Sequence, residues 1–172
     1  FGSPKSSQPA INGWSDVQAM LPNAGTALAP GDDGAVLVNL AFSFPYAGGS
    51  WTQMFVGGNG IIGFGANPNP SGFYDPADFY SATPKLAAYY LDLDPSSGGT
   101  VRSKSDATKH TITWSAVPAY GTANLNTFQI VLYANGNFTF TYNGIASTVS
   151  TSPIVLGFHP GGAPPLETIS FS

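Results

Sequence analysis

Residues 128–142, FQIVLYANGNFTFTY, are the stretch that most constrains the fold, because two alternating apolar runs flank a turn. The turn residues, Ala134-Asn135-Gly136-Asn137, are typical of a β-hairpin. A two-residue turn would pair Leu132 with Thr139 and mix apolar and polar side chains on both faces. A three-residue loop instead pairs Leu132 with Phe138 and needs Gly136 in the left-handed conformation of a G1 bulge. The sequence therefore predicts the bulged hairpin.

This register gives the hairpin one apolar face and one more polar face. The apolar face is predicted to hold Phe128, Ile130, Leu132, Phe138, Phe140 and Tyr142, and the other face Gln129, Val131, Thr139 and Thr141. A slip of one residue would turn the whole apolar set toward water. Because such a face must be covered, we expect a second layer of structure to pack against it.

The rest of the chain repeats the pattern of short strands and turns. Strand-like runs are expected at 35–44, 51–56, 61–65, 84–93, 100–104, 110–114 and 153–158, with a possible edge strand at 167–172. Segment 66–83 reads as a long loop, and 14–21 is the only plausible helical turn. About nine to ten short strands separated by Gly and Pro turns are typical of an all-β sandwich or barrel.

Length and composition limit the classes of protein further. The 172 residues fit one domain, predicted at 11–172, preceded by a Pro- and Ser-rich flexible arm at 1–10. Only 8% of residues are charged and five are basic, which argues against nucleic-acid binding. No apolar run reaches the ~18 residues of a membrane span. The absence of cysteine excludes disulfides, thiol catalysis and cysteine zinc sites. A surface of Ser, Thr, Asn, Gly and Tyr suits an extracellular or cell-surface protein.

Several segments along the chain match the patterns of one known family. Residues 42–46 and 54–64 (FSFPY and MFVGGNGIIGF) are similar to the pattern FPFYG…VYVNSNGFLTFG, and 86–101 contains LAAYYLDLDP and GGTV, similar to IAPFWDDLDP…GGTV. The segments 111–118 and 126–142 also have counterparts, in the right order, so the chain resembles nidogen-type (NIDO-like) extracellular domains. The family's Trp-Asp-Asp reads Tyr90-Leu91-Asp92 here. The resemblance implies an antiparallel β-sandwich in an exported, often modular protein with adhesive, matrix or accessory roles and no defined catalytic residues.

Two kinds of ligand site are suggested by residue type. An aromatic group could stack on sugar rings, or could be core and rim packing instead; the candidates are Trp51, Phe73, Tyr74, Phe79 and Tyr80. Asp92 and Asp94 share a face and could bind Ca²⁺, although the spacing departs from an EF-hand loop. A looser oxygen site could add Asp75 or Asp78. Otherwise these aspartates are turn formers, and no cofactor is expected.

Catalytic and modification motifs are sparse. His110 begins a strand, where we expect it to point away from Ile112 and Trp114, and His159 lies in a turn. Neither accompanies a recognisable nucleophile motif. Asn137-Phe138-Thr139 is an N-glycosylation sequon. The hypothesis is therefore a non-catalytic structural or adhesive module that self-associates through residues 1–10. The alternative is a carbohydrate-binding accessory domain of a secreted hydrolase.

Overall fold

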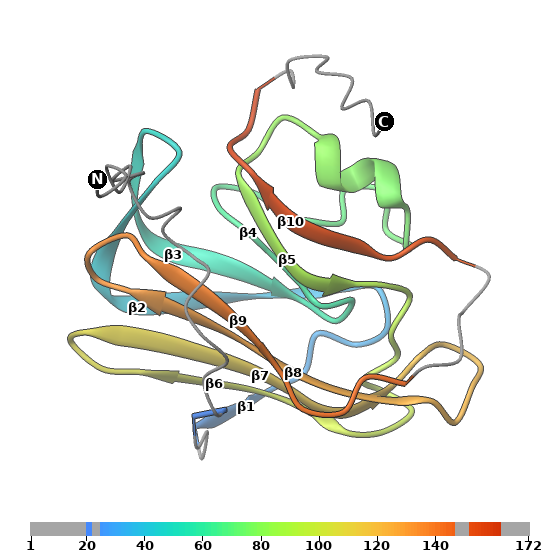
Figure 1. Ribbon diagram of the computed structural model, residues 1–172. Coiled ribbons are helices and arrows are strands. Elements are labelled where there is room, and N and C mark those ends of the chain that lie inside the picture. The colour runs from blue at the N-terminus through green and yellow to red at the C-terminus, as the bar shows by residue number, and fades with distance from the viewer. Residues whose placement is uncertain (1–19, 22–24, 147–151, 163–172) are drawn as a thin grey trace, which may run out of the picture.

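A computed structural model describes residues 20–21, 25–146 and 152–162, and this part of the chain is a β-sandwich of ten strands in two antiparallel sheets (Figure 1). The predicted fold class is thus confirmed, and a 3₁₀ helix is its only helical element within those ranges. The predicted arm at 1–10, most of the helical turn at 14–21 and the possible strand at 167–172 lie outside the described residues.

Each sheet has five strands. Sheet I has the order β1-β6-β7-β8-β9, with β1 at Thr26–Leu28, β6 at Thr100–Ser105, β7 at Lys109–Pro118, β8 at Leu125–Tyr133 and β9 at Phe138–Tyr142. Sheet II has the order β10-β5-β4-β3-β2, with β10 at Val155–His159, β5 at Lys85–Tyr90, β4 at Ile61–Gly63, β3 at Gly49–Gly57 and β2 at Ala35–Tyr46. Strands β9 and β10 each lie at one edge of their sheet, and Phe138 of β9 packs against Phe158 of β10 (Figure 1). These two edges therefore lie on the same side of the sandwich, which we call the open side of the described residues.

The β8–β9 hairpin has the predicted register. Phe128 pairs with Tyr142, Ile130 with Phe140 and Leu132 with Phe138, and Gly136 has φ 90°. The predicted inward face is fully buried at four of its six positions, whereas Phe140 is half-buried and Tyr142 is 41% exposed. These two side chains lie on an edge strand, where no further strand of sheet I covers them.

The opposite face of this hairpin is not open to water. Gln129 and Val131 are buried, although the alternation places them on the solvent side of a two-layer sandwich. The side chain of Gln129 is held by the backbone of Leu21, which lies more than a hundred residues away in the sequence. Sequence periodicity cannot reveal such a cover.

The core between the sheets is built on stacked aromatic rings. Trp114 of β7 stacks on Phe128 of β8 with ring centroids 5.0 Å apart. Its indole N–H points to sheet II, where it donates to the carbonyl oxygens of Gly57 and Gly58 at 3.1 Å each. The predicted alternation of β2 is also confirmed, with Leu40 and Phe44 facing the core.

The long loop at 66–83 contains the 3₁₀ helix η1, Pro76–Tyr80, and closes around a buried lysine. Asp75 caps η1 by accepting a hydrogen bond from the Ala77 amide at 2.8 Å. The Nζ of Lys85 donates to the hydroxyl groups of Ser81 and Thr83 at 2.6 and 2.8 Å and to their carbonyl oxygens at 3.4 and 3.1 Å. Burial lowers the pKa of Lys85 to about 8. This loop therefore folds around an internal ammonium group.

Candidate functional site

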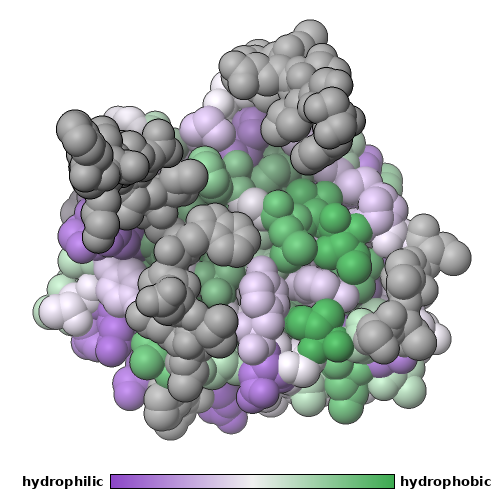
Figure 2. Space-filling view, viewed as in Figure 1, coloured by the Kyte–Doolittle hydropathy of each residue, from purple (hydrophilic) through white to green (hydrophobic). Residues whose placement is uncertain are grey.

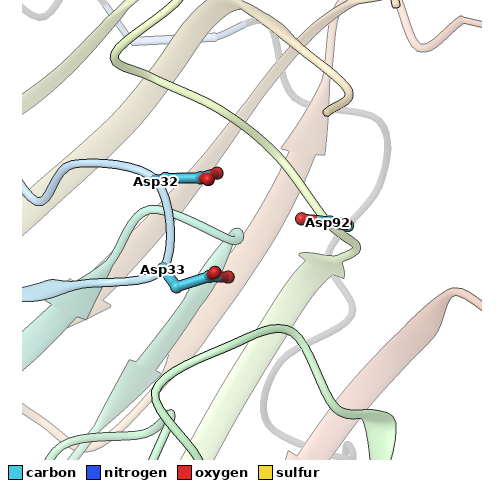
Figure 3. Close-up of side chains that lie close together, drawn as sticks. All are labelled: Asp32, Asp33 and Asp92. Atoms are coloured by element: carbon cyan, nitrogen blue, oxygen red, sulfur yellow. The ribbon is translucent and has the colours of Figure 1, made fainter. Parts of the chain in front are cut away.

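Three carboxylates meet at one end of the sandwich. Asp32 and Asp33 lie in the turn that precedes β2, and Asp92 follows β5. One carboxylate oxygen from each lies within 4.8 Å of the other two, and the side chains point toward one another (Figure 3). Asp92 was predicted from the sequence as a ligand, whereas Asp32 and Asp33 were not. The motif Pro30-Gly31-Asp32-Asp33-Gly34 was the available signal.

Asn59, in the turn between β3 and β4, ties the two acidic loops together. Its side chain is fully buried, and its Nδ2 donates to Asp33 Oδ1 at 2.9 Å while its Oδ1 accepts from the Leu93 amide at 2.7 Å. The neighbouring Gly58 allows the turn that holds Asp32 and Asp33 to pack against the β3–β4 turn. A Cβ at position 58 would lie 2.4 Å from the Asp32 carbonyl oxygen. The close approach of the three carboxylates is thus fixed by the backbone.

Burial and mutual repulsion raise the pKa values of two of these carboxylates. Burial raises the pKa of Asp32 to about 6, with further contributions from Asp33, Asp94 and Asp92. Burial, followed by Asp33 and Asp94, also raises the pKa of Asp92. Asp32 Oδ1 is buried and has no hydrogen-bond partner among the described residues. A hard cation such as Ca²⁺ would neutralise these charges and would take the carboxylate oxygens as part of a set of about six to eight oxygen ligands.

Asp94, the second predicted ligand, has a different environment. It is buried, and its two carboxylate oxygens accept hydrogen bonds from the amides and hydroxyl groups of Ser96 and Ser97. These bonds lower the pKa of Asp94. Asp94 therefore shapes the turn after β5, as a turn-forming aspartate does. Asp78 in the long loop is likewise engaged, by the amide and hydroxyl groups of Ser71 at 3.2 and 2.8 Å.

Four of the five aromatic residues proposed as a sugar platform lie in the long loop, where Phe79 and Tyr74 pack in one small cluster with Tyr90. Phe79 is buried and meets Tyr80 edge-on, with centroids 5.2 Å apart and planes at 84°. Tyr74 meets Tyr90 at 64°, and its hydroxyl donates to the Pro153 carbonyl. Phe73 and Tyr80 are more than half exposed.

Trp51, the fifth residue of that group, lies on β3. There it borders a hollow of about 330 Å³ on the outer face of sheet II. The lining residues are Leu37, Ser50, Trp51, Thr52, Gln53, Phe55 and Gly65.

The two histidines are both buried. The expectation that His110 points outward is wrong: residues 110, 112 and 114 alternate onto the same face, and His110 is 1% exposed with its Nε2 2.7 Å from Ser103 Oγ. Burial lowers its pKa to about 4, and its Nδ1 has no partner among the described residues. His159 accepts a hydrogen bond from the Gly161 amide at Nδ1. Among the described residues, no carboxylate orients the Ser103–His110 pair as one would in a catalytic triad.

The sequon residue Asn137 lies in the β8–β9 turn. Its amide donates to Asn135 Oδ1 at 3.1 Å, and its carbonyl accepts from the Tyr133 amide at 2.8 Å. The side chain of Thr139, the third residue of the sequon, is 8% exposed.

Apolar side chains are exposed along the open side of the sandwich. Ile154, Leu156 and Phe158, at alternate positions of the β10 segment, are 38%, 57% and 49% exposed. Phe158 also reaches Phe138 of β9, with ring centroids 5.9 Å apart. Figure 2 shows hydrophobic surface along the line of β10. We call Tyr142, Ile154, Leu156 and Phe158 the edge patch.

Comparisons with known proteins identify the family. Searches of curated proteins and of solved structures returned no match. No helix within the described ranges has the length and apolar character needed to cross a membrane. A family model described as NIDO related matches residues 13–162. That match spans most of the two-sheet sandwich and agrees with the segments that resemble nidogen-type domains. The chain therefore belongs to the NIDO-related family.

Proposed function

We propose that this chain is an extracellular, non-catalytic binding module that associates with a second copy of itself by strand addition at its open side. The edge patch is the observation that supports this proposal. Its four large side chains are each 38–57% exposed; Tyr142 lies on β9, Leu156 and Phe158 lie on β10, and Ile154 directly precedes β10. Apolar side chains gathered at one place on a surface mark interaction sites more often than single exposed ones do.

The backbone of the same strands supports strand addition. Within the described residues, β9 pairs only with β8 and β10 pairs only with β5. Each strand therefore presents one row of amide and carbonyl groups that an added strand could satisfy. The edge patch contains no charged side chain of the kind that blunts sheet edges in monomeric proteins.

A second copy is the partner that the composition favours. The net charge is only −4 over 172 residues, so two copies repel each other weakly. Residues 1–10 carry no pattern that predicts a core, and they end at Pro9-Ala10, which can enter only the start of an edge strand. We propose that this arm of one copy adds to the open side of the next.

Light scattering over a concentration series tests self-association. We expect the full chain to form dimers or larger species, and we expect deletion of residues 1–10, or Leu156→Lys, to give monomers. Leu37→Lys is the matched control, because Leu37 is 50% exposed on another part of the molecule. A full chain that stays monomeric at high concentration, or a deletion variant that assembles equally well, would refute the proposal.

The non-catalytic and extracellular parts of the proposal rest on the family and on the composition. Domains of this type are typically extracellular, and the chain lacks the thiols and most of the charges that many enzymes use. We expect esterase, glycosidase and protease substrates to be turned over at background rates. Turnover that disappears in His110→Ala or His159→Ala would contradict the non-catalytic assignment.

A further inference from the structure

We propose that the hollow beside Trp51, on the outer face of β2 and β3, binds a neutral saccharide. This site is separate from the edge patch and does not depend on self-association. It draws on one aromatic residue of the predicted sugar platform, Trp51, and on four side chains that the sequence did not single out: Leu37, Thr52, Gln53 and Phe55.

The position of the hollow determines how a ligand would be recognised. Leu37 of β2 and Phe55 of β3 are cross-strand partners, while their neighbours Met54 and Val56 face the core. Strand β3 lies between β2 and β4, and Phe55 pairs with Leu37 on one side and with Gly63 on the other. The hollow lies over the side chains of these strands, so a ligand there would be held mainly by side chains.

The lining combines aromatic carbon with uncharged polar groups. Trp51 and Phe55 are partly buried, with Trp51 packed against the core, and Ser50, Thr52 and Gln53 are exposed. Aromatic rings can pack against the apolar C–H face of a sugar, while hydroxyl and amide groups can donate to and accept from its hydroxyl groups. A hollow of about 330 Å³ is at the lower end of the range for small-ligand sites, about 300–1,000 Å³.

The absence of charge narrows the ligand class. None of the seven lining residues is Asp, Glu, Lys, Arg or His. A charged ligand would lose hydration here without gaining an ionic partner, which costs free energy. Neutral saccharides therefore fit better than uronic acids, sulfated glycans or charged peptides.

The polar and aromatic groups are already held in place. Gln53 Nε2 donates to Asn39 Oδ1 at 2.8 Å, and the hydroxyl groups of Ser43 and Ser50 lie 2.6 Å apart. The Gln53 side-chain oxygen and the second hydrogen of its Nε2 stay available to a ligand.

The Trp51 ring is also fixed. Its Nε1 donates to the Tyr46 carbonyl at 3.0 Å. Gly65, with φ 85°, approaches the ring so closely that a Cβ there would lie 3.1 Å from it. Because these groups need little ordering on binding, the entropic cost of association is reduced.

Affinity electrophoresis provides the test. Native gels would contain a soluble β-1,3-glucan, a xylan or a galactomannan, and alginate would serve as the acidic control. We expect at least one neutral polysaccharide to retard the wild-type protein, and we expect alginate not to. Phe55→Ala and Gln53→Ala should each weaken this affinity at least tenfold. Tyr120→Ala, at an aromatic side chain 57% exposed elsewhere, should leave it unchanged.

Two variants keep the result interpretable. Gln53 is exposed, so its replacement should leave folding intact even if Phe55→Ala destabilises the sheet. Leu156→Lys should retain full retardation, which separates this site from the edge patch. The proposal is wrong if none of the neutral polysaccharides retards the wild type, or if the Gln53 and Tyr120 variants migrate alike in every gel.

Discussion

The side-chain amide of Gln129 binds the backbone of Leu21 as a neighbouring strand would, with Leu21 N–H donating to Oε1 at 2.9 Å and Nε2 donating to the Leu21 carbonyl at 2.8 Å. The same Nε2 also donates to Thr113 Oγ1 at 2.8 Å. One buried amide thereby attaches a segment that precedes β1 to the outer face of sheet I.

Replacing Gln129 by alanine should release this segment. We expect Gln129→Ala to lower the free energy of unfolding by about 2–3 kcal/mol, because the fully buried Gln129 amide and the partly buried backbone groups of Leu21 lose their hydrogen bonds. Urea unfolding measures the change. Gln53→Ala is the matched control, since that glutamine is exposed, and it should change stability by less than about 0.5 kcal/mol. Equal losses in the two variants would show that the Leu21 contact contributes nothing.

Alanine substitutions at two glycines can distinguish the effect of backbone strain from that of a steric clash. Gly136 and Gly144 have nearly the same φ, 90° and 92°, but only Gly136 is crowded: a Cβ there would lie 2.9 Å from the Pro45 carbonyl oxygen. Gly144→Ala should cost about 1–2 kcal/mol from the left-handed conformation alone. Gly136→Ala should cost about 1–3 kcal/mol more, because the hairpin must move away from β2. Thermal or urea unfolding that ranks the two equally would contradict the packing of the hairpin against Pro45.

His110 should make the protein sensitive to acid. Burial lowers its pKa in the folded state to about 4 from the ordinary histidine value of 6.5, so the unfolded chain binds the proton more tightly. Its neutral form is fully compatible with folding above pH 6.5, and stability falls as the pH decreases from 6.5 toward 4. The loss from this one group approaches about 3 kcal/mol. Urea unfolding at pH 7 and pH 4.5 should show a steeper decrease for the wild type than for His110→Gln. Parallel decreases would assign the acid sensitivity to other groups.

The acidic cluster predicts a response to calcium. Since the pKa of Asp32 is raised to about 6, its ionisation opposes folding as the pH rises from 3.8 through 6. When a chelator has removed calcium, Asp32→Asn should therefore melt at a higher temperature than the wild type at pH 7.5. Millimolar Ca²⁺ should raise the melting temperature of the wild type and leave Asp32→Asn unchanged.

Asp94→Asn distinguishes the observed cluster from the pair expected from the sequence. It should lower stability, because the turn loses hydrogen bonds to Ser96 and Ser97, yet it should keep the full calcium response. If Asp94→Asn abolishes the calcium response, Asp94 is a calcium ligand after all. The absence of any calcium effect on the wild type would leave Asp32, Asp33 and Asp92 as a structural cluster.

The features that could be predicted from the sequence depend on neighbouring residues. The register of the hairpin follows from Gly136 and the alternation on either side of it, and the sandwich follows from many such short strands. The contacts that could not be predicted join distant segments. Asp32 meets Asp92 only because the loops before β2 and after β5 are tied through Asn59, and Gln129 is buried only because Leu21 crosses it. The prediction that His110 points outward was wrong because His110 and Ile112 are two residues apart on a strand, and such residues lie on the same face.

Lys85 has a further consequence for the loop that carries η1. Four oxygen atoms from Ser81 and Thr83 surround its ammonium group much as ligands surround a bound metal ion. Here, however, the cation is covalently tethered to β5. It cannot be removed by a chelator or exchanged for another ion. The geometry of this loop therefore does not depend on which metal ions surround the protein.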